Sequence, residues 1–370
     1  MRIHMMTPSL TTGDAIGNYI ISLQRVFAQL GVKVHLYADH IDPVFRQNAR
    51  PTAAYHPTGH DILWFHYSIW GDNFAILEES NDFKVMDYHG VTPPHLMDHD
   101  PRLEALCDKA IKALPSYRGV FDWCIHHSDF ARQDLERAGY TNFSKVHYPV
   151  DTVFFGLEED ETLAAMARQL EYILFVSRVV PQKDVLSTLR VFAEVQKTRP
   201  QTCLLLVGGT DLLPTYVDQV RSEIQRLGIE NRVQMTGKVN DRAALTALFR
   251  HAKFLICLSD WESFFVPAVE AMFFGVPVIH TGEPPVSENV GDAGVVIDKR
   301  NPVGAAGRIV AVWNDAEAYV RLRDNALRRS TRFTDAALVD VLRGVLKDWA
   351  TAFGQYAAGA VIESSTSKSP

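Results

Sequence analysis

The sequence lacks long hydrophobic runs. No stretch of about 18 consecutive apolar residues occurs in the 370-residue chain. The first residues, MRIHMMTPSL, contain no apolar segment of the kind found in secretory signal peptides. These absences exclude a membrane-spanning helix. They predict a cytoplasmic protein. A weak peripheral contact with the inner face of the membrane stays open.

An excess of basic residues and metal-binding cysteine pairs are also missing. The net charge of −7 argues against a nucleic-acid partner, which would favour a basic excess. The few cysteines are scattered without metal-site spacing and are expected to be reduced core residues: Cys107, Cys124, Cys203 and Cys257. The segment Asp98–Asp100 has the form Asp-x-Asp, but we interpret it as the N-terminal cap of a helix. We therefore predict neither a metal nor another cofactor.

What the chain does contain is a regular alternation of apolar strands and amphipathic helices. A hydrophobic content of 47% and a length of 370 residues favour two globular domains. The alternation occurs twice, which predicts two parallel sheets covered by helices. Predicted strands are 2–6, 33–38, 61–67, 83–89, 123–127 and 145–149 in the first half, and 172–177, 203–209, 232–237, 254–259, 276–280 and 294–298 in the second.

The clearest functional signal is ESFFVPAVE at 262–270. Pro267 suits the first turn of a helix, and Gly275 suits its end. The amides of Phe264, Phe265 and Val266 would then be free donors at a helix N-terminus, which is a site for an anion such as phosphate. Glu270 could accept hydrogen bonds from a ribose diol, with Glu262 close by. The alternative is an amphipathic helix with two solvated glutamates.

Three further segments place functional groups where predicted strands end. Arg178 and Lys183 follow the strand 172–177, and two cations beside a helix N-terminus suit a diphosphate. Gly208 and Gly209 end the next strand and would allow close approach of the backbone to a ligand. The corner Gly237–Lys238–Val239 could hold a nucleobase edge through main-chain contacts.

Together these segments resemble the retaining glycosyltransferases of family 4, most strongly over residues 170–300. The resemblance implies the α/β GT-B fold, with two Rossmann-like, doubly wound domains facing across a cleft. It implies that Arg178 and Lys183 bind the donor diphosphate, that Glu270 binds the ribose and that Glu262 contacts the donor sugar. The amides of Phe264–Val266 would meet sugar and phosphate.

The pattern departs from the family at four positions that usually hold glycine. Ser263 and Phe265 replace the two glycines of the family's EGFG pattern. Ser177 precedes Arg178, and Asp184 follows Lys183, where the family has glycine. These departures leave the identity of the donor open rather than the class of enzyme.

The N-terminal half resembles the family more loosely. His89, at the end of a predicted strand, matches a histidine near the donor sugar and the reaction centre, and His66 is the next candidate. The glycine loop 12–17, with Gly13 and Gly17, would cap the donor phosphates. The predicted domains are an acceptor-side domain (1–155), a nucleotide-sugar-binding domain (156–345), a helix crossing back to the first domain (346–360) and a disordered tail (361–370).

The resemblance therefore implies a retaining, metal-independent glycosyltransferase that uses a nucleotide diphosphate sugar. GDP-mannose is the first expectation for the donor, with UDP-sugars next, and the acceptor would be a glycan or a lipid-linked glycan in polysaccharide assembly. Residues predicted to act in catalysis are His89, Arg178, Lys183 and Glu262. The alternatives are a nucleotide-sugar epimerase of similar shape and a non-catalytic nucleotide-sugar-binding protein.

Overall fold

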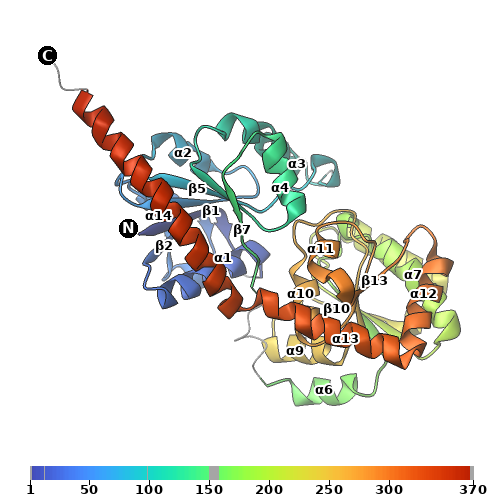
Figure 1. Ribbon diagram of the computed structural model, residues 1–370. Helices are drawn as coiled ribbons and strands as arrows, with labels where there is room; N and C mark the ends of the chain where they lie inside the picture. Colours follow the sequence, from blue (N-terminus) through green and yellow to red (C-terminus); the bar gives the residue numbers. More distant parts are fainter. Residues whose placement is uncertain (1, 12, 98, 150–157, 367–370) are drawn as a thin grey trace. The chain divides into compact units, whose positions relative to one another are not determined.

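The computed structural model describes residues 2–11, 13–97, 99–149 and 158–366, and it divides into two compact units. The first unit comprises residues 1–149 and 335–370, and the second comprises residues 150–334. Figure 1 shows that each unit is built around its own sheet, with helices packed on the faces. The predicted boundary at 155/156 lies outside the described residues.

The first unit contains a parallel sheet of seven strands in the order β3-β2-β1-β4-β5-β6-β7. Its strands are β1 (Ile3–Leu10), β2 (Val34–Ile41), β3 (Ala49–Pro51), β4 (Ile62–Tyr67), β5 (Phe83–Tyr88), β6 (Trp123–His126) and β7 (Phe143–Lys145). Its helices are α1 (Ala15–Gln29), α2 (Ala75–Glu79), α3 (Pro101–Ala113), α4 (Asp129–Arg137) and α14 (Asp335–Thr366). All strand pairs in this sheet are parallel, as the alternation of strands and helices predicts.

Two edge strands differ from the prediction. β3 was not predicted, because Ala49–Pro51 is short and contains a proline, which is compatible with an edge strand only. The last strand of this unit is Phe143–Lys145, so the prediction of a strand over 145–149 was wrong beyond its first residue. Asp100 caps α3 by accepting from the amides of Arg102 and Leu103, as predicted, whereas Asp98 lies outside the described residues.

The long helix α14 joins the first unit from its first residue. Asp335 pairs with Arg25 of α1 at 2.7 Å, and the fully buried Trp349 packs edge-on against Trp64 of β4. The unit boundary therefore lies at 334/335 and not at the predicted 345/346, since these contacts begin at Asp335. Residues 361–366, predicted as part of a disordered tail, continue α14, and residues 367–370 lie outside the described part.

The second unit contains a six-stranded parallel sheet in the order β10-β9-β8-β11-β12-β13. Its strands are β8 (Tyr172–Val176), β9 (Cys203–Val207), β10 (Val233–Gly237), β11 (Phe254–Cys257), β12 (Val278–His280) and β13 (Gly294–Val296). Its helices are α6 (Glu161–Ala167), α7 (Val185–Thr198), α8 (Pro214–Leu227), α9 (Arg242–His251), α10 (Val266–Phe273), α11 (Val286–Val290), α12 (Pro302–Asn314) and α13 (Ala316–Ser330).

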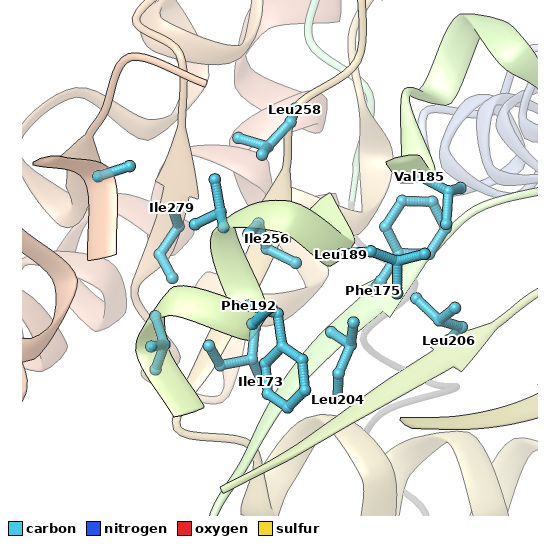
Figure 2. Close-up of a cluster of buried hydrophobic side chains, with 14 of the residues drawn as sticks. Ile173, Phe175, Val185, Leu189, Phe192, Leu204, Leu206, Ile256, Leu258 and Ile279 are labelled. Atoms are coloured by element: carbon cyan, nitrogen blue, oxygen red, sulfur yellow. The ribbon is translucent and has the colours of Figure 1, made fainter. Parts of the chain in front are cut away.

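Alternating side chains of this sheet form the core beneath α7. Ile173 and Phe175 of β8 point to the same face as Leu204 and Leu206 of β9, because side chains two apart on a strand share a face. Figure 2 shows these residues packed against Leu189 and its neighbours on α7. The intervening residues of β8 are also buried, so both faces of the sheet are covered, as in a doubly wound fold.

The structure agrees with the predicted fold class, since each unit is a parallel, Rossmann-like α/β domain. In such sheets, ligands bind at the carboxyl ends of the strands. Among the described residues, no helix is both long enough and apolar enough to cross a lipid bilayer.

Candidate functional site

The predicted site residues of the second unit gather at one edge of its sheet. Arg178 follows β8, and Gly208 follows β9. Gly237 is the last residue of β10, and Glu262 lies between β11 and α10. Because β10, β9, β8 and β11 are consecutive neighbours in a parallel sheet, their carboxyl ends lie side by side. Residues that are far apart in sequence therefore meet at one location.

Lys183 and Glu262 form a buried ion pair at this edge. Lys183 ends the short 3₁₀ turn Pro181–Lys183, and its Nζ donates to Oε2 of Glu262 at 2.8 Å. The two side chains are only 11% and 9% exposed. Oε1 of Glu262 accepts from the hydroxyl of Ser259 at 2.7 Å. Burial, and to a smaller extent the charge of Glu262, raises the pKa of Cys257 to about 12. Lys183, predicted to bind the diphosphate, and Glu262, predicted to contact the sugar, thus contact each other directly.

Arg178 differs from Lys183 in its surroundings. Its side chain is exposed, and within the described residues its guanidinium makes no ion pair. A guanidinium in this condition retains all its donors for a bound anion. Of these two cations, Lys183 is therefore already paired, whereas Arg178 has no ion-pair partner among the described residues.

The N-terminus of α10 has the predicted form. The helix begins at Val266, with Pro267 in its first turn, and Gly275 follows its end at φ 67°. The amides of Phe265 and Val266 donate to no group within the described part of the chain. The carbonyl of Phe264 accepts from the side chain of Asn289 at 2.7 Å, which fixes the loop that carries these amides. Asn289 was missed because its own segment carries no ligand-binding pattern.

Glu270 lies one turn into α10 and is half-buried. Its place on the same helix as the Phe265 and Val266 amides agrees with the predicted arrangement of an anion site beside a carboxylate. Its role as the ribose ligand stays a prediction.

Two of the four departures from the family's glycine pattern coincide with unusual backbone geometry. Among the described residues, the non-glycine residues with positive φ are Asp184 (φ 44°) and Phe265 (φ 66°). Such a conformation costs a non-glycine residue about 1–2 kcal/mol relative to glycine. The fold therefore keeps the glycine-type backbone at both positions even though the side chains have changed. Asp184 directly follows Lys183 in the sequence, and Phe265 lies three residues after Glu262.

The glycines of the neighbouring strands serve mainly to bring backbone segments together. A Cβ on Gly208 would lie 1.8 Å from the carbonyl oxygen of Ser177, so only glycine fits there. The Gly208 amide donates to the carbonyl of Gly237, and Gly209 accepts from the amide of Val179. This close approach is between strand ends, and the predicted approach of the backbone to a ligand stays a prediction. Lys238 is exposed and Val239 half-buried at the same corner.

An open pocket of about 770 Å³ adjoins this edge beyond β11. Its wall consists of Ser259, Asp260, Thr281, Glu283, Val296–Asn301, Gly304, Ala305 and Arg308. None of the predicted site residues lines this pocket. Ser259 connects it to the predicted site, since the same residue hydrogen-bonds Glu262.

The remaining predicted residues belong to the first unit. Gly13 is exposed, with φ 79°, in the loop before α1. Gly17 lies inside the first turn of α1, where its amide donates to the capping Asp14 at 3.0 Å. A Cβ there would come within 3.2 Å of the Thr11 carbonyl oxygen, so Gly17 has a packing role as well as its predicted ligand role.

His89 lies at the end of β5, as predicted, but is only 2% exposed. Its Nε2 is 2.9 Å from Nδ1 of His66, and its Nδ1 is 2.5 Å from the hydroxyl of Tyr148. Burial lowers the pKa of His66 to about 3 and places that of His89 well below its ordinary value. A contact between His89 and a sugar would require one of these two hydrogen bonds to exchange. The catalytic role of His89 stays a prediction.

Asp87 and His127 complete this buried cluster and were not predicted. The Asp87 carboxylate accepts from the indole of Trp64 at 2.7 Å and lies 2.9 Å from Nε2 of His127. Nδ1 of His127 is 2.7 Å from the carbonyl oxygen of Val146, so that nitrogen must carry a proton. Nε2 of His127 thus lies close to Oδ1 of Asp87, although the two atoms make no hydrogen bond of good geometry within the described residues. Asp87 looks in the sequence like an ordinary strand residue.

His66, Asp87 and His89 also have ligand-type atoms within 4.8 Å of one another, which raises the question of a metal. The two histidine nitrogens, however, are in direct contact at 2.9 Å, whereas two nitrogen ligands of a tetrahedral zinc ion lie about 3.3 Å apart. This contact is a hydrogen bond between the two rings. The three residues therefore form a hydrogen-bonded cluster.

Comparison with known proteins agrees with the predicted resemblance. Residues 159–329 match the family described as Glycosyl transferases group 1. The matched segment contains Arg178, Lys183, Glu262 and Glu270. The predicted resemblance to glycosyltransferases is thereby confirmed.

The chain is 27% identical over 184 residues to a D-inositol 3-phosphate glycosyltransferase of Corynebacterium efficiens, a match that covers 49% of this chain and 43% of that protein. It is 29% identical over 143 residues to a GDP-mannose:cellobiosyl-diphosphopolyprenol alpha-mannosyltransferase of Xanthomonas oryzae, covering 38% of this chain and 37% of that protein. These matches thus span less than half of each relative.

Among solved structures, the Anabaena protein HepE in complex with UDP-glucose is similar, with a TM-score of 0.74 and 18% identity. The superposition covers 94% of this chain and all of that chain. At this level of identity the likeness establishes the fold alone.

Proposed function

We propose that this protein is a retaining glycosyltransferase that moves a sugar from a nucleotide diphosphate sugar to an acceptor hydroxyl. The observation that carries the proposal is the meeting of Arg178, the Lys183–Glu262 pair and the α10 N-terminus at one edge of the second sheet. The segment that forms this edge is also the segment matched by the group 1 glycosyl transferase family.

The chemistry of the step suits these groups. Breaking the anomeric bond places negative charge on the departing diphosphate, and preorganised donors stabilise that charge in the transition state. Arg178 supplies a guanidinium that pairs with no carboxylate in the described part of the chain, and the Phe265 and Val266 amides supply main-chain donors. The leaving phosphate can accept the proton of the acceptor hydroxyl, so that attack occurs on the face from which the diphosphate leaves and the anomeric configuration is retained.

For the donor we propose GDP-mannose, with UDP-sugars as the main alternative. The Xanthomonas relative is named for GDP-mannose, which favours the first, and HepE binds UDP-glucose on a similar fold, which favours the second. For the acceptor we propose a glycan or a lipid-linked glycan. In the first 150 residues the chain has no basic excess, so a strong electrostatic hold on an anionic membrane is not part of the proposal.

A screen of GDP-, UDP- and ADP-sugars by thermal shift, followed by turnover with the stabilising donor, tests the function. We expect one nucleotide series to raise the melting temperature, and we expect release of its diphosphate during turnover. Binding without release of nucleotide diphosphate would indicate a non-catalytic binding protein. Formation of a new nucleotide sugar without an acceptor would indicate an epimerase.

We further propose that transfer needs no divalent metal, because side chains and amides supply the positive groups around the diphosphate. Turnover should then continue in EDTA at its full rate. Loss of turnover in EDTA with recovery in Mg²⁺ or Mn²⁺ would contradict this part of the proposal.

His89→Ala should lower kcat by about 3- to 10-fold and leave nucleotide affinity nearly unchanged, if the ring loses one hydrogen bond to the sugar or the acceptor. Because His89 is buried and bonded through both nitrogens, the melting temperature should fall as well. His126→Ala is a matched control, since His126 is also buried at a strand end, where it hydrogen-bonds the Ser128 carbonyl and packs edge-on against the Phe143 ring. An equal loss of melting temperature in both variants, with unchanged kcat in both, would leave His89 with a structural role.

A further inference from the structure

Lys299 reaches from the segment after β13 to the two turns that carry the Lys183–Glu262 pair. Its Nζ donates to Oδ2 of Asp184 at 2.7 Å, to Oδ1 of Asp260 at 2.5 Å and to the carbonyl oxygen of Leu258 at 2.9 Å. All three hydrogens of the ammonium group therefore have a partner. The side chain is only 20% exposed.

The two turns are also joined directly to each other. The amide of Asp260 donates to the carbonyl of Gln182 at 2.9 Å, and the Gln182 side chain donates to the carbonyl of Trp261 at 3.2 Å. Lys183 and Glu262, the next residues along each turn, form the ion pair. The position of this pair thus depends on how the turn 181–184 and the segment 258–262 are held together.

The conformation of Asp184 explains why the turn 181–184 needs the contact with Lys299. It adopts φ 44° at a position where the resembled family has glycine. Its Oδ1 caps α7 by accepting from the amide of Ser187 at 3.1 Å, and its Oδ2 binds Lys299. The side chain that glycine lacks is therefore used twice, and these bonds hold the backbone in a conformation that costs energy for aspartate.

The charge balance excludes a phosphate-binding role for Lys299 itself. Burial lowers the pKa of Lys299, but Asp184 and Asp260 outweigh burial and the pKa is raised. The group stays charged, yet two carboxylates neutralise it. A cation with both charge and hydrogens already committed orders its neighbours and has little left to offer a diphosphate.

We propose that Lys299 is a positioning residue for the transfer reaction. It clamps the turn 181–184 to the segment 258–262, so that Lys183 and Glu262 keep their place at the donor site, and it compensates for aspartate at the glycine position 184. The inference rests on the proposed function, because it assumes that Lys183 and Glu262 meet the donor.

The test compares Lys299→Met with Arg300→Met, using the donor found by thermal shift. Arg300 is the next residue, carries the same charge and is 89% exposed, so its replacement is a matched control. We expect Lys299→Met to lower kcat by about 10- to 100-fold with a smaller change in KM, because a displaced group loses transition-state contacts. Lys299→Arg should recover part of the loss, and Arg300→Met should behave as the wild type.

Asp184→Gly provides the second comparison. Glycine adopts a positive φ without a counter-ion, so Asp184→Gly/Lys299→Met should have a higher kcat than Lys299→Met, yet a lower one than Asp184→Gly because the Asp260 contact is still lost. If Lys299→Met does not fold, the double variant is compared with Asp184→Gly instead. A lower kcat in the double variant than in Asp184→Gly supports the clamp, and an equal kcat in the two overturns it.

Calorimetric titration with GDP and UDP separates the possible failures. Wild-type protein that binds neither nucleotide and transfers no sugar would overturn the proposed function and the clamp with it. Wild-type binding and turnover, together with a Lys299→Met variant that matches Arg300→Met in kcat, would overturn the clamp alone. A Lys299→Met variant that melts earlier but keeps kcat when folded would likewise assign Lys299 to stability only.

Discussion

Lys183→Met is expected to lower kcat by about 10²–10³-fold, because a donor aimed at developing negative charge typically contributes about 2.7–4 kcal/mol to transition-state stabilisation. KM for the donor should rise much less, since the charge on the diphosphate grows as the anomeric bond breaks. Steady-state kinetics with the stabilising donor measures both quantities. A rise in KM at constant kcat would mean that Lys183 only binds the ground state.

The same substitution should also destabilise the protein, which must be separated from the loss of catalysis. Removing Lys183 leaves the buried Glu262 carboxylate with the Ser259 hydroxyl and the weak donor Cys257 Sγ, and breaking a buried pair in this way costs about 3–5 kcal/mol. Lys183→Met/Glu262→Gln removes both charges. We expect it to recover much of the melting temperature and none of the activity. Recovery of both would show that the single variant failed through folding.

Much of this site could be predicted because its signals are local. Pro267 and Gly275 mark the two ends of α10, and the loop before it supplies the amides, so a single stretch of sequence defines the helix N-terminus. Arg178 and Lys183 were found in the same way, since both follow one apolar strand. The strand order of a parallel sheet then brings these local signals together.

What could not be predicted depends on contacts between distant segments. Lys299 follows a different strand from those that carry Lys183 and Glu262, and nothing in its own surroundings distinguishes it from a solvated lysine. The partnership of His127 with Asp87 is of the same kind, because adjacent strands bring them together only after the sheet has formed. Gly208 was predicted to let the backbone approach a ligand, which stays a prediction, and the close contact with the Ser177 carbonyl was not foreseen.

The backbone at Asp184 and Phe265 adds a third kind of information. From the sequence, replacement of glycine at these positions indicates a change in the site. The structure has a positive φ at both positions, which is a backbone conformation that glycine adopts most readily. Asp184 is stabilised in this conformation by its cap and its ion pair.

Glu270→Ala is expected to lower kcat/KM for the donor by about 30- to 150-fold, which corresponds to the roughly 2–3 kcal/mol of hydrogen bonds from a ribose diol to a carboxylate. The substitution lies within α10, where alanine is a good helix former, so the fold should be retained and circular dichroism should be unchanged. Glu317→Ala is a matched control on α13, since the Glu317 side chain is 90% exposed.

A ligand lacking the diol identifies the contact itself. If Glu270 binds the ribose, wild-type protein should bind the 2′,3′-dideoxy form of its nucleoside diphosphate less tightly than the normal form, by a factor similar to the loss caused by Glu270→Ala. The Glu270→Ala variant should bind the two forms with nearly equal affinity, because the partner of the diol is already gone. Calorimetry on the two proteins with the two ligands measures this coupling. Independent, additive losses would show that Glu270 affects binding without contacting the ribose, and the assignment of the paired glutamates would then have to be revised.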